Sequence, residues 1–572
     1  MTDQRNMFLA IIISMIILFT WDYFFAPKPV EQNQLNAIQA PENLLPNAPN
    51  QIIDNSSDAL IVTEDRNSVL SKQERIPIHT QKLNGSVSLK GLRFDDLTLA
   101  SYRETTDPSS KEIELLSPIG SPNPYYAEIG WISADRDILL PSKDTVWTTS
   151  ANNTVLSSDE TIVMTWKNQN GLEFRRSISI DNNYMFQVYN EVTNNGDTSI
   201  SLYPYGLVTR IDKPEVEGFF ILHEGPLGVF QDTLTELDYD DLTADESRKE
   251  FSSTGGWLGF TDKYWLTVLA YDQSAKIEAA FRHINSRGNR DRYQTEFRTT
   301  EPIIIAPGKT DGTMTYLFSG AKEVEILDNY TETLGIKRFD LAIDFGWFYF
   351  LTKPFFYSLI WLKSVLGNFG LAILALTVAL RLLLFPLANK QFRAMTKLKK
   401  LQPEMKELQT KYSDDKTRMN QELMELYKRE KANPAAGCLP ILVQIPIFFA
   451  LYKVLFVTIE MRHEPFYGWI NDLSARDPTS IFNLFGLFPF DVPSFLVIGA
   501  WPIIMGITMW LQQKLNPAPT DPMQAQIMSF LPIIFTFLLA TFPAGLVIYW
   551  AWSNALGILQ QWFIMRQAGV KV

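Results

Sequence analysis

The chain has 572 residues, of which 46% are hydrophobic, a formal net charge of −12 and a single cysteine. It is too long for one ordinary domain, and one cysteine excludes an internal disulfide framework. The four histidines are scattered, and the sequence contains neither an HExxH motif nor a CxxC pair. These residues therefore predict no metal site.

Charge and hydropathy divide the chain in two. Residues 28–340 contain 29 Lys and Arg against 47 Asp and Glu, a net charge of −18, which leaves the rest of the chain at +6. Nearly all the long apolar runs lie in that basic remainder and at the amino terminus. An acidic water-soluble domain joined to a membrane domain with basic loops is the organisation that this division predicts.

The first apolar run covers residues 7–25 and ends in bulky aromatic residues, among them Trp21 and Tyr23. A cleaved signal peptide ends instead in small residues, whereas aromatic side chains are typical of a membrane interface. We predict an uncleaved signal-anchor helix over 1–25, and a removed signal sequence is the alternative. Residues 26–58 are rich in Pro, Asn and Gln and are predicted to be a flexible linker.

Residues 59–340 contain short alternating runs, such as Thr161–Trp166 and Phe174–Ile180, with turn dipeptides at Asn84-Gly85 and Asn195-Gly196. This pattern predicts an external antiparallel β-sandwich. The next stretch, 341–366, is apolar but is interrupted by Lys353-Pro354. Since a charge and a proline disfavour a spanning helix there, an amphipathic helix in the outer interface is the expectation.

The remaining residues, 367–572, are predicted to form a helical membrane core. Its candidate spans are about 369–387, 439–457, 494–511, 527–542 and 546–565, the last two joined by the tight turn Pro543-Ala544-Gly545. With the anchor they make six transmembrane helices, several near the lower length limit. The fold class is thus a multi-domain membrane protein, with a six-helix α-helical bundle and an external β-sandwich.

Basic residues predict the orientation of the core. Residues 388–437 contain twelve Lys and Arg and seven Asp and Glu, whereas residues 458–493 contain two and five. The first loop is therefore expected in the cytoplasm and the second outside. Alternation then places both termini in the cytoplasm and the acidic domain outside.

Residues 388–437 also have two stretches of helical apolar spacing, which predict a cytoplasmic helical hairpin. Ser413-Asp-Asp415 offers a cap for the second helix, and Pro403 should kink or interrupt the first. A docking arm for another macromolecule, such as a ribosome, is one interpretation, and a solvated loop whose lysines enforce topology or contact anionic lipid is the other. The apolar positions are Met395, Leu398, Met405, Leu408, Met419, Leu423, Leu426 and Tyr427.

Arg381 stands inside an otherwise uncharged apolar run. A guanidinium there costs about 2.5–3.5 kcal/mol on insertion scales and cannot lose its proton, so it either snorkels to the interface or faces a hydrated cavity. Other polar residues fall at similar depth, which favours a shared hydrophilic cavity over isolated helix–helix contacts. They are Thr377, Gln444, Tyr549, Ser553 and Asn554, with Trp550 adjacent.

The run from Asn433 to Tyr452, NPAAGCLPILVQIPIFFALY, closely resembles the third-span signature of the YidC/Oxa/Alb family of membrane protein insertases. Further matches follow in order through the core, and the external domain and anchor resemble the Gram-negative bacterial form. They are LRLLLFPL at 380–387, LQP at 401–403, WINDLS at 469–474, DPMQ at 521–524 and FPAGLVIYW at 542–550. The stretch 482–493 is longer than the resemblance leads us to expect.

The resemblance implies a membrane protein insertase and chaperone of the bacterial inner membrane, acting alone or with the Sec translocon. It implies no enzyme, no catalytic residues and no cofactor. It implies a hydrophilic groove in the inner leaflet, with Arg381, Thr377, Gln444, Tyr549 and Trp550 as groove residues, and a β-supersandwich for the periplasmic domain. Trp550 stands where family members often have a second Tyr. The implied partners are nascent membrane proteins, the Sec translocon, the ribosome and targeting factors at 388–437, and membrane lipids, but not DNA.

Two other classes of protein stay open on the residues alone. A transporter or channel would need polar groups through both leaflets, whereas the polar residues found here lie mostly in the inner half. A membrane-anchored carbohydrate enzyme would place its activity in the external domain and would leave the basic hairpin unexplained.

Overall fold

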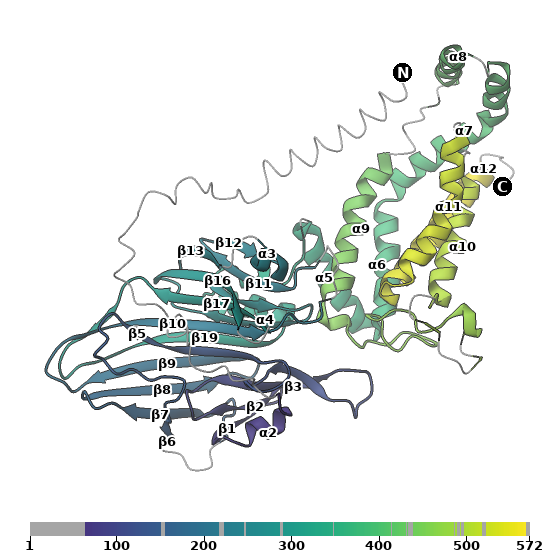
Figure 1. The fold of residues 1–572 in the computed structure, drawn as a ribbon. Coiled ribbons are helices and arrows are strands. Elements are labelled where there is room, and N and C mark those ends of the chain that lie inside the picture. The colour runs from purple at the N-terminus through teal and green to yellow at the C-terminus, as the bar shows by residue number, and fades with distance from the viewer. Residues whose placement is uncertain are drawn as a thin grey trace.

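The computed structural model describes residues 63–149, 155–216, 222–244, 248–286, 290–346, 348–412, 415–430, 432, 439–485, 487–488, 492–493, 497–516 and 522–567. The predicted anchor, 1–25, and the predicted linker, 26–58, lie outside these residues. Figure 1 shows a domain of packed sheets, coloured purple to teal, beside a bundle of helices coloured green to yellow.

Two antiparallel sheets form the first domain. One sheet has ten strands in the order β1-β2-β3-β5-β10-β17-β16-β13, with β4 paired to β3 and β18 to β10, and the other has nine in the order β12-β11-β14-β15-β19-β9-β8-β7-β6. The ten-stranded sheet contains β1 (Arg75–His79), β2 (Leu83–Ser88), β3 (Phe94–Arg103), β4 (Glu112–Leu116), β5 (Tyr125–Ser133), β10 (Ile200–Ile211), β13 (Arg248–Thr254), β16 (Lys276–Ser286), β17 (Arg290–Thr299) and β18 (Ile303–Ile305). The nine-stranded sheet contains β6 (Thr148–Thr149), β7 (Thr161–Lys167), β8 (Leu172–Ile180), β9 (Met185–Asn194), β11 (Gly225–Phe230), β12 (Thr233–Glu236), β14 (Trp257–Thr261), β15 (Trp265–Ala270) and β19 (Thr310–Ala321).

The alternating runs in the sequence produce these strands. In β8, for example, the alternate positions from Leu172 to Ile180 are buried while those between them are more exposed, because successive side chains of a strand point to opposite faces. Asn195-Gly196 connects β9 to β10 as predicted. The prediction of a turn at Asn84-Gly85 was wrong, because both residues lie within β2, where the register shifts between Gly85 and Val87.

The longer helices follow the strands in the chain. Three short elements, α2 (Arg66–Leu70), α3 (Tyr239–Ala244) and η3 (Phe339–Ala342), lie on or near the sheets, and α4 (Val324–Thr333) leads from β19 toward the bundle. The bundle contains α5 (Tyr349–Leu366), α6 (Phe369–Leu383), α7 (Phe385–Lys411), α8 (Lys416–Arg429), α9 (Leu439–Val457), α10 (Ala500–Leu515), α11 (Pro522–Leu539) and α12 (Ala544–Gln567). One cluster of buried apolar side chains is continuous from the sheets into α5, α6, α9 and α12.

The run predicted as one span over about 369–387 is broken. α6 ends at Leu383 and α7 begins at Phe385, with an angle of 69° between the two helices. Pro386, in the first turn of α7, explains the break, since a proline has no N–H for the preceding turn and its ring clashes with the carbonyl there. Asn368 caps the other end of α6 by accepting a hydrogen bond from the Leu371 N–H.

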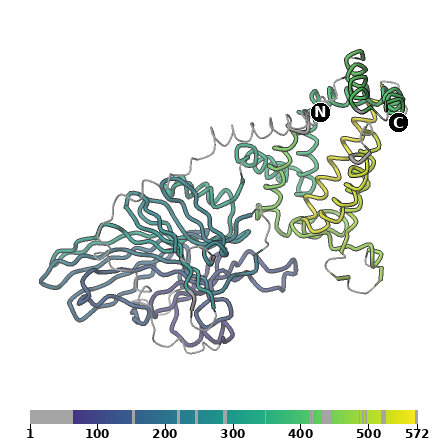
Figure 2. The backbone as a smooth tube through the Cα atoms, turned by 45° about the horizontal axis from the view of Figure 1, so that its top comes forward, coloured from purple at the N-terminus to yellow at the C-terminus, as the bar shows by residue number. Residues whose placement is uncertain are grey.

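α7 and α8 form the predicted helical hairpin. Their apolar faces pack together around Leu401, Met405, Leu423 and Leu426, and Asp415 caps α8 by accepting from the Arg418 N–H at 3.0 Å. Pro403 does not interrupt the first arm, because α7 continues through it, and the alternative that it kinks the helix stays a prediction. Figures 1 and 2 both place the hairpin at the end of the bundle away from the sheets.

α5 is amphipathic. It buries Phe355, Phe356 and Leu359, and it exposes Phe350 and Trp361 on another face. Its Lys353 pairs with Asp328 of α4 at 2.7 Å, so the charge that interrupts the apolar run is neutralised by the preceding helix. The placement of this helix in a membrane interface stays a prediction.

No single helix within the described ranges combines the length and the apolar character needed to cross a membrane, whereas the bent pair α6 and α7 passes that test together. Shorter apolar stretches occur at Gln444–Val457 and Ala525–Leu539. The count of six spans therefore stays a prediction, and the helix predicted from residue 494 begins at Ala500.

Candidate functional site

Arg381, near the end of α6, contacts α12. Its Nη2 atom donates hydrogen bonds to the backbone carbonyl oxygen of Ser553 at 2.7 Å and to the Ser553 Oγ atom at 2.8 Å. The side chain is half-buried. A snorkelling arginine extends toward open solvent, whereas this guanidinium is held against a neighbouring helix.

Thr377 lies one turn before Arg381 on the same face of α6. It is buried, and its hydroxyl donates to the Ile373 carbonyl oxygen at 2.7 Å. This bond to the preceding turn is the usual way for a threonine to satisfy its hydroxyl inside a helix. The predicted neighbour of Arg381 is thus on the expected face, but its hydroxyl hydrogen is committed to its own helix.

The other predicted groove residues lie on α9 and α12. Gln444 is exposed on α9, and Tyr549 is buried one turn before Ser553 on α12. The Trp550 ring lies 4.9 Å from the ring of Phe448 on α9 and 5.6 Å from that of Phe535 on α11. Tyr549 and Trp550 therefore belong to an aromatic cluster that joins three helices, next to the turn that holds Arg381.

Sequence reasoning missed the contribution of α10. The Asn554 amide donates to Thr508 Oγ1 at 3.4 Å, and a Cβ added to Gly557 would lie 3.5 Å from both terminal nitrogens of Arg381 and 3.3 Å from Gln512 Nε2. Gly557 therefore leaves the space in which the guanidinium and the Gln512 amide meet. A glycine four residues after Ser553, inside an apolar helix, was the signal that could have indicated this close approach.

Polar groups continue along α12 beyond Gly557. Gln561 is buried and donates to Asn516 Oδ1 at 3.1 Å, and its own Oε1 atom is buried without a hydrogen-bond partner among the described residues. A buried acceptor of this kind is costly unless water or a ligand satisfies it. We call this row the polar seam, and it comprises Arg381, Thr508, Gln512, Asn516, Ser553, Asn554, Gly557 and Gln561.

The opposite end of the helices is tied together by the loop after α9. Asp477 is buried, and it accepts hydrogen bonds from the Trp469 indole at 3.1 Å and from the backbone N–H of Trp501, in the first turn of α10, at 2.9 Å. The same loop accepts from the start of α12 at Ala544 and Gly545 through the Ala475 and Leu473 carbonyls. The bundle is thus fastened at the end remote from the polar seam.

A basic pocket lies between α7 and the end of α12. Arg393, Lys397 and Lys400 recur at helical spacing on α7, and Thr396 and Ile564 line the pocket between them. The three basic side chains are exposed, whereas Thr396 and Ile564 are buried. Three cations thus line this pocket, and a basic lining favours anionic groups.

The sheets and the bundle meet around Glu460 and Arg462, just beyond α9. Glu460 Oε1 accepts from the Val324 N–H at 3.2 Å, and Arg462 donates to the Arg103 carbonyl oxygen at 2.6 Å. Burial raises the pKa of Glu460 to about 7, and the charges of Glu323 and Glu325 act in the same direction. A carboxyl group that titrates near neutral pH therefore lies in the joint.

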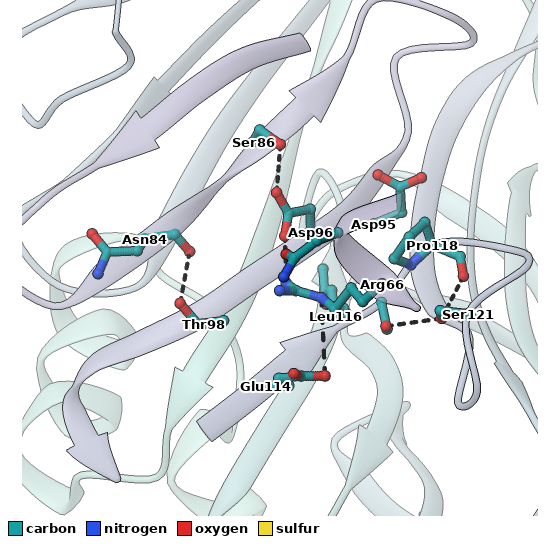
Figure 3. Close-up of polar contacts among 12 residues, drawn as sticks. Arg66, Asn84, Ser86, Asp95, Asp96, Thr98, Glu114, Leu116, Pro118 and Ser121 are labelled. Atoms are coloured by element: carbon teal, nitrogen blue, oxygen red, sulfur yellow. Dashed lines mark hydrogen bonds and ion pairs between the residues drawn. The ribbon is translucent and has the colours of Figure 1, made fainter. Parts of the chain in front are cut away.

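One cluster of polar side chains in the sheet domain lies between α2 and the strands. Arg66 of α2 pairs with Asp96 and donates to the Leu116 carbonyl oxygen at 3.3 Å, while Ser86 donates to the same carboxylate (Figure 3). Asp95 pairs with Arg75, yet burial raises the pKa of Asp95. Each of these two carboxylates has an arginine partner, so the cluster attaches α2 to the sheet and gives no support to carbohydrate chemistry.

Comparisons with known proteins agree with one family over the whole chain. A family model described as "60Kd inner membrane protein" matches residues 361–571, and one described as "YidC periplasmic domain" matches residues 75–358. The "Membrane protein insertase YidC" of Beijerinckia indica is 48% identical over 100% of this chain and 97% of its own. That of Rickettsia felis is 48% identical over 98% and 99%.

A solved structure titled "Active YidC insertase crystal structure with the first transmembrane domain resolved" covers 85% of this chain and 92% of its own. It is 16% identical with a TM-score of 0.36, so family membership rests on the sequence matches. These extend over both domains at nearly half identity. The chain belongs to the YidC family of membrane protein insertases.

Proposed function

We propose that this protein inserts nascent proteins into the bacterial inner membrane by receiving their hydrophilic parts at the polar seam. The contact between Arg381 and Ser553 is the observation that carries the proposal. It holds a permanent cation between apolar helices and beside further polar groups of α10 and α12. A cation kept there against its insertion cost marks a functional site.

The two ends of the bundle support a groove that is open toward the cytoplasm. The polar seam runs along α12 toward the basic pocket at Arg393, whereas Asp477 fastens the opposite end. We therefore expect water and substrate to enter from the hairpin side. Both termini in the cytoplasm, six spans and the sheet domain in the periplasm complete this topology, as the basic loops predict.

In this mechanism a short amino-terminal tail or a hairpin loop of the substrate enters the groove first. The Arg381 bonds to Ser553 use one of its two terminal nitrogens, so the rest of the guanidinium is available to a substrate carboxylate. The apolar segment of the substrate meanwhile slides along the aromatic cluster of Trp550 and Phe448 into lipid. Burial of apolar area and the membrane potential supply the driving force, and neither a covalent step nor a nucleotide is needed.

The partners follow from the same arrangement. The hairpin of α7 and α8 presents basic side chains away from the sheets, and we assign it to the ribosome and to targeting factors. A chaperone role and cooperation with the Sec translocon are part of the proposal, since helices that release a substrate sideways into lipid can also deliver it to another membrane protein. Anionic lipid head groups fit the basic pocket.

Photo-crosslinking tests the proposal directly. A photoreactive amino acid at Gln444 or Trp550, present while a small membrane protein is being synthesised, should give adducts with that nascent chain. The matched control is Val365, which is exposed on α5, a helix that contributes no residue to the polar seam or to the aromatic cluster of Trp550, and it should give far fewer adducts. Equal labelling from Val365 and Trp550, or no adducts from either groove position, would contradict the proposal.

A further inference from the structure

The loop between α9 and α10 contains a turn whose large apolar side chains point outward instead of being buried. Large apolar side chains are exposed at six positions, and Leu487 reaches 74% exposure. The sequence from Thr479 to Phe490 contains no charged residue. The six exposed residues, named the apolar turn, are Ile481, Phe482, Leu484, Phe485, Leu487 and Phe488.

Two local backbone hydrogen bonds close the apolar turn. The Phe485 N–H donates to the Ser480 carbonyl oxygen at 2.6 Å, and the Phe488 N–H donates to that of Asn483 at 3.0 Å. Leu484 and Phe485 have φ angles of 50° and 59°, a conformation that is uncommon for bulky residues. The turn is therefore a folded element that holds its apolar side chains outward.

The apolar turn is attached to the start of α10. The Ile481 N–H donates to the Ile498 carbonyl oxygen at 3.1 Å, and the Ala500 N–H donates to Thr479 Oγ1 at 3.0 Å. In both Figure 1 and Figure 2 the loop extends from the end of the bundle opposite the hairpin, on the side away from the sheets.

Most exposed side chains of α10, which begins beside the base of the turn, are also apolar. They are Ile504, Ile507, Trp510 and Leu511, as expected for a helix that faces acyl chains. Exposed apolar side chains in this number are rare on a surface that faces water. Irregular backbone with internal hydrogen bonds and outward apolar side chains is instead suited to the boundary between head groups and acyl chains.

We propose that the apolar turn inserts into the outer leaflet of the lipid bilayer and anchors the periplasmic end of α10 there. The occupant of this surface is lipid, because the turn is uncharged and extends the lipid-facing surface of α10. The inference rests on the proposed membrane placement of α10 and is independent of the role of the polar seam.

Spin-label accessibility tests the proposal on the full-length protein. Cys438 is the only cysteine, so single cysteines are introduced into a Cys438→Ser background and the labelled proteins are reconstituted into vesicles of phosphatidylethanolamine and phosphatidylglycerol. Labels at Phe485→Cys and Leu487→Cys should collide several-fold more with oxygen, which concentrates in lipid, than with a water-soluble nickel chelate. Ala475→Cys, exposed in the same loop, should show the reverse preference.

Ile507→Cys on α10 separates failure of the inference from failure of the membrane placement. If Ile507→Cys is accessible to oxygen and Phe485→Cys is accessible to the chelate, the inference is overturned and the proposed function stands. If labels in the apolar turn are shielded from both reagents, a protein partner covers the turn and the lipid assignment is overturned. Chelate access at all positions overturns both.

A second variant guards against disturbance by the label. With Phe485 and Leu487 both replaced by Asn, a label at Phe482→Cys should shift from oxygen access toward chelate access, because the turn loses much of the apolar surface that holds it in lipid. An unchanged oxygen preference at Phe482 would show that these side chains do not anchor the turn and would overturn the proposal.

Discussion

Arg381 on α6 donates two hydrogen bonds, of 2.7 and 2.8 Å, to the carbonyl oxygen and the hydroxyl of Ser553 on α12, which lies 172 residues later in the chain. Ser553 does not neutralise the cation, because neither acceptor is charged. The guanidinium is positioned by the protein while its charge stays available to an approaching carboxylate. Among the described residues, Arg381 is thus held through neutral acceptors of Ser553, and this arrangement is the basis of the first prediction.

Replacing Arg381 with Ala should impair insertion of substrates with acidic tails more than insertion of matched substrates with neutral tails. We expect a difference of about ten-fold, which corresponds to ~1.4 kcal/mol. The measurement is insertion of paired substrates into vesicles containing the variant. Arg381→Lys keeps the charge and should retain much of the preference for acidic tails. Equal insertion of both substrates by the Ala variant would show that Arg381 does not attract acidic tails.

Gly557 should tolerate a methyl group and reject a larger side chain. A Cβ would lie in ordinary contact with Arg381 and at 3.3 Å from the Gln512 amide, so Gly557→Ala should be mild. Gly557→Leu must displace the guanidinium from Ser553, and overpacking of this kind costs about 1–3 kcal/mol. Thermal unfolding and the insertion assay on both variants test this prediction. Equal loss of activity in the two variants would show that Gly557 is not needed to leave space for the Arg381 side chain.

The joint between the sheets and the bundle should weaken as pH rises through the range between about 4.5 and 7. A glutamate carboxyl in water has an ordinary pKa of 4.5, and burial in the joint raises that of Glu460 to about 7, so the docked state keeps a proton that the undocked state releases in this range. Stability then falls with rising pH, by an amount on the order of 3 kcal/mol at full ionisation, and the loss is complete above pH 7.

Thermal unfolding of the purified protein between pH 4 and 8 measures this dependence, and Glu460→Gln should flatten it. Burial lowers the pKa of the neighbouring His463, so its titration overlaps the same range, and His463→Gln is the matched control that should retain the slope. A slope that survives in Glu460→Gln would assign it to another group.

The hairpin should be stable only with its internal apolar contacts. Leu426 is buried between α7 and α8, and truncation of a buried leucine costs about 2–5 kcal/mol. Leu426→Ala should therefore accelerate hydrogen exchange throughout α8. Met424 lies on the same helix and is 41% exposed, so Met424→Ala should leave the exchange rates nearly unchanged. Similar exchange in the two variants would mean that α8 is not held by α7.

The sequence contained most of the information for the elements. Strand alternation, the apolar stripes of the hairpin and the cap at Asp415 were legible because each depends on neighbours within a few residues. Asn84-Gly85 was misread as a turn because the glycine is required by the packing of β2 against β3. A Cβ at Gly85 would lie 2.1 Å from the Asp96 carbonyl oxygen.

The candidate site was legible in part for the same reason. Arg381 and Tyr549 stand out as polar residues in apolar runs, whereas Gln512 and Asn516 follow an apolar helix and look like ordinary residues of its end. Their role depends on how α10 packs against α12, which no local pattern specifies. The break at Leu384 was missed because the hydropathy of the run continues through Pro386 while the helix axis does not.

The break between α6 and α7 sets the hairpin at a large angle to α6. Because α7 leaves α6 at 69° instead of along its axis, a sideways load on the hairpin acts as a torque on α6, and only Leu384 separates the two helices. Rotation of α6 moves Arg381 around its circumference relative to Ser553. If a large particle docks on α8, as the proposed function expects, its load would reach the cation through a connection one residue long.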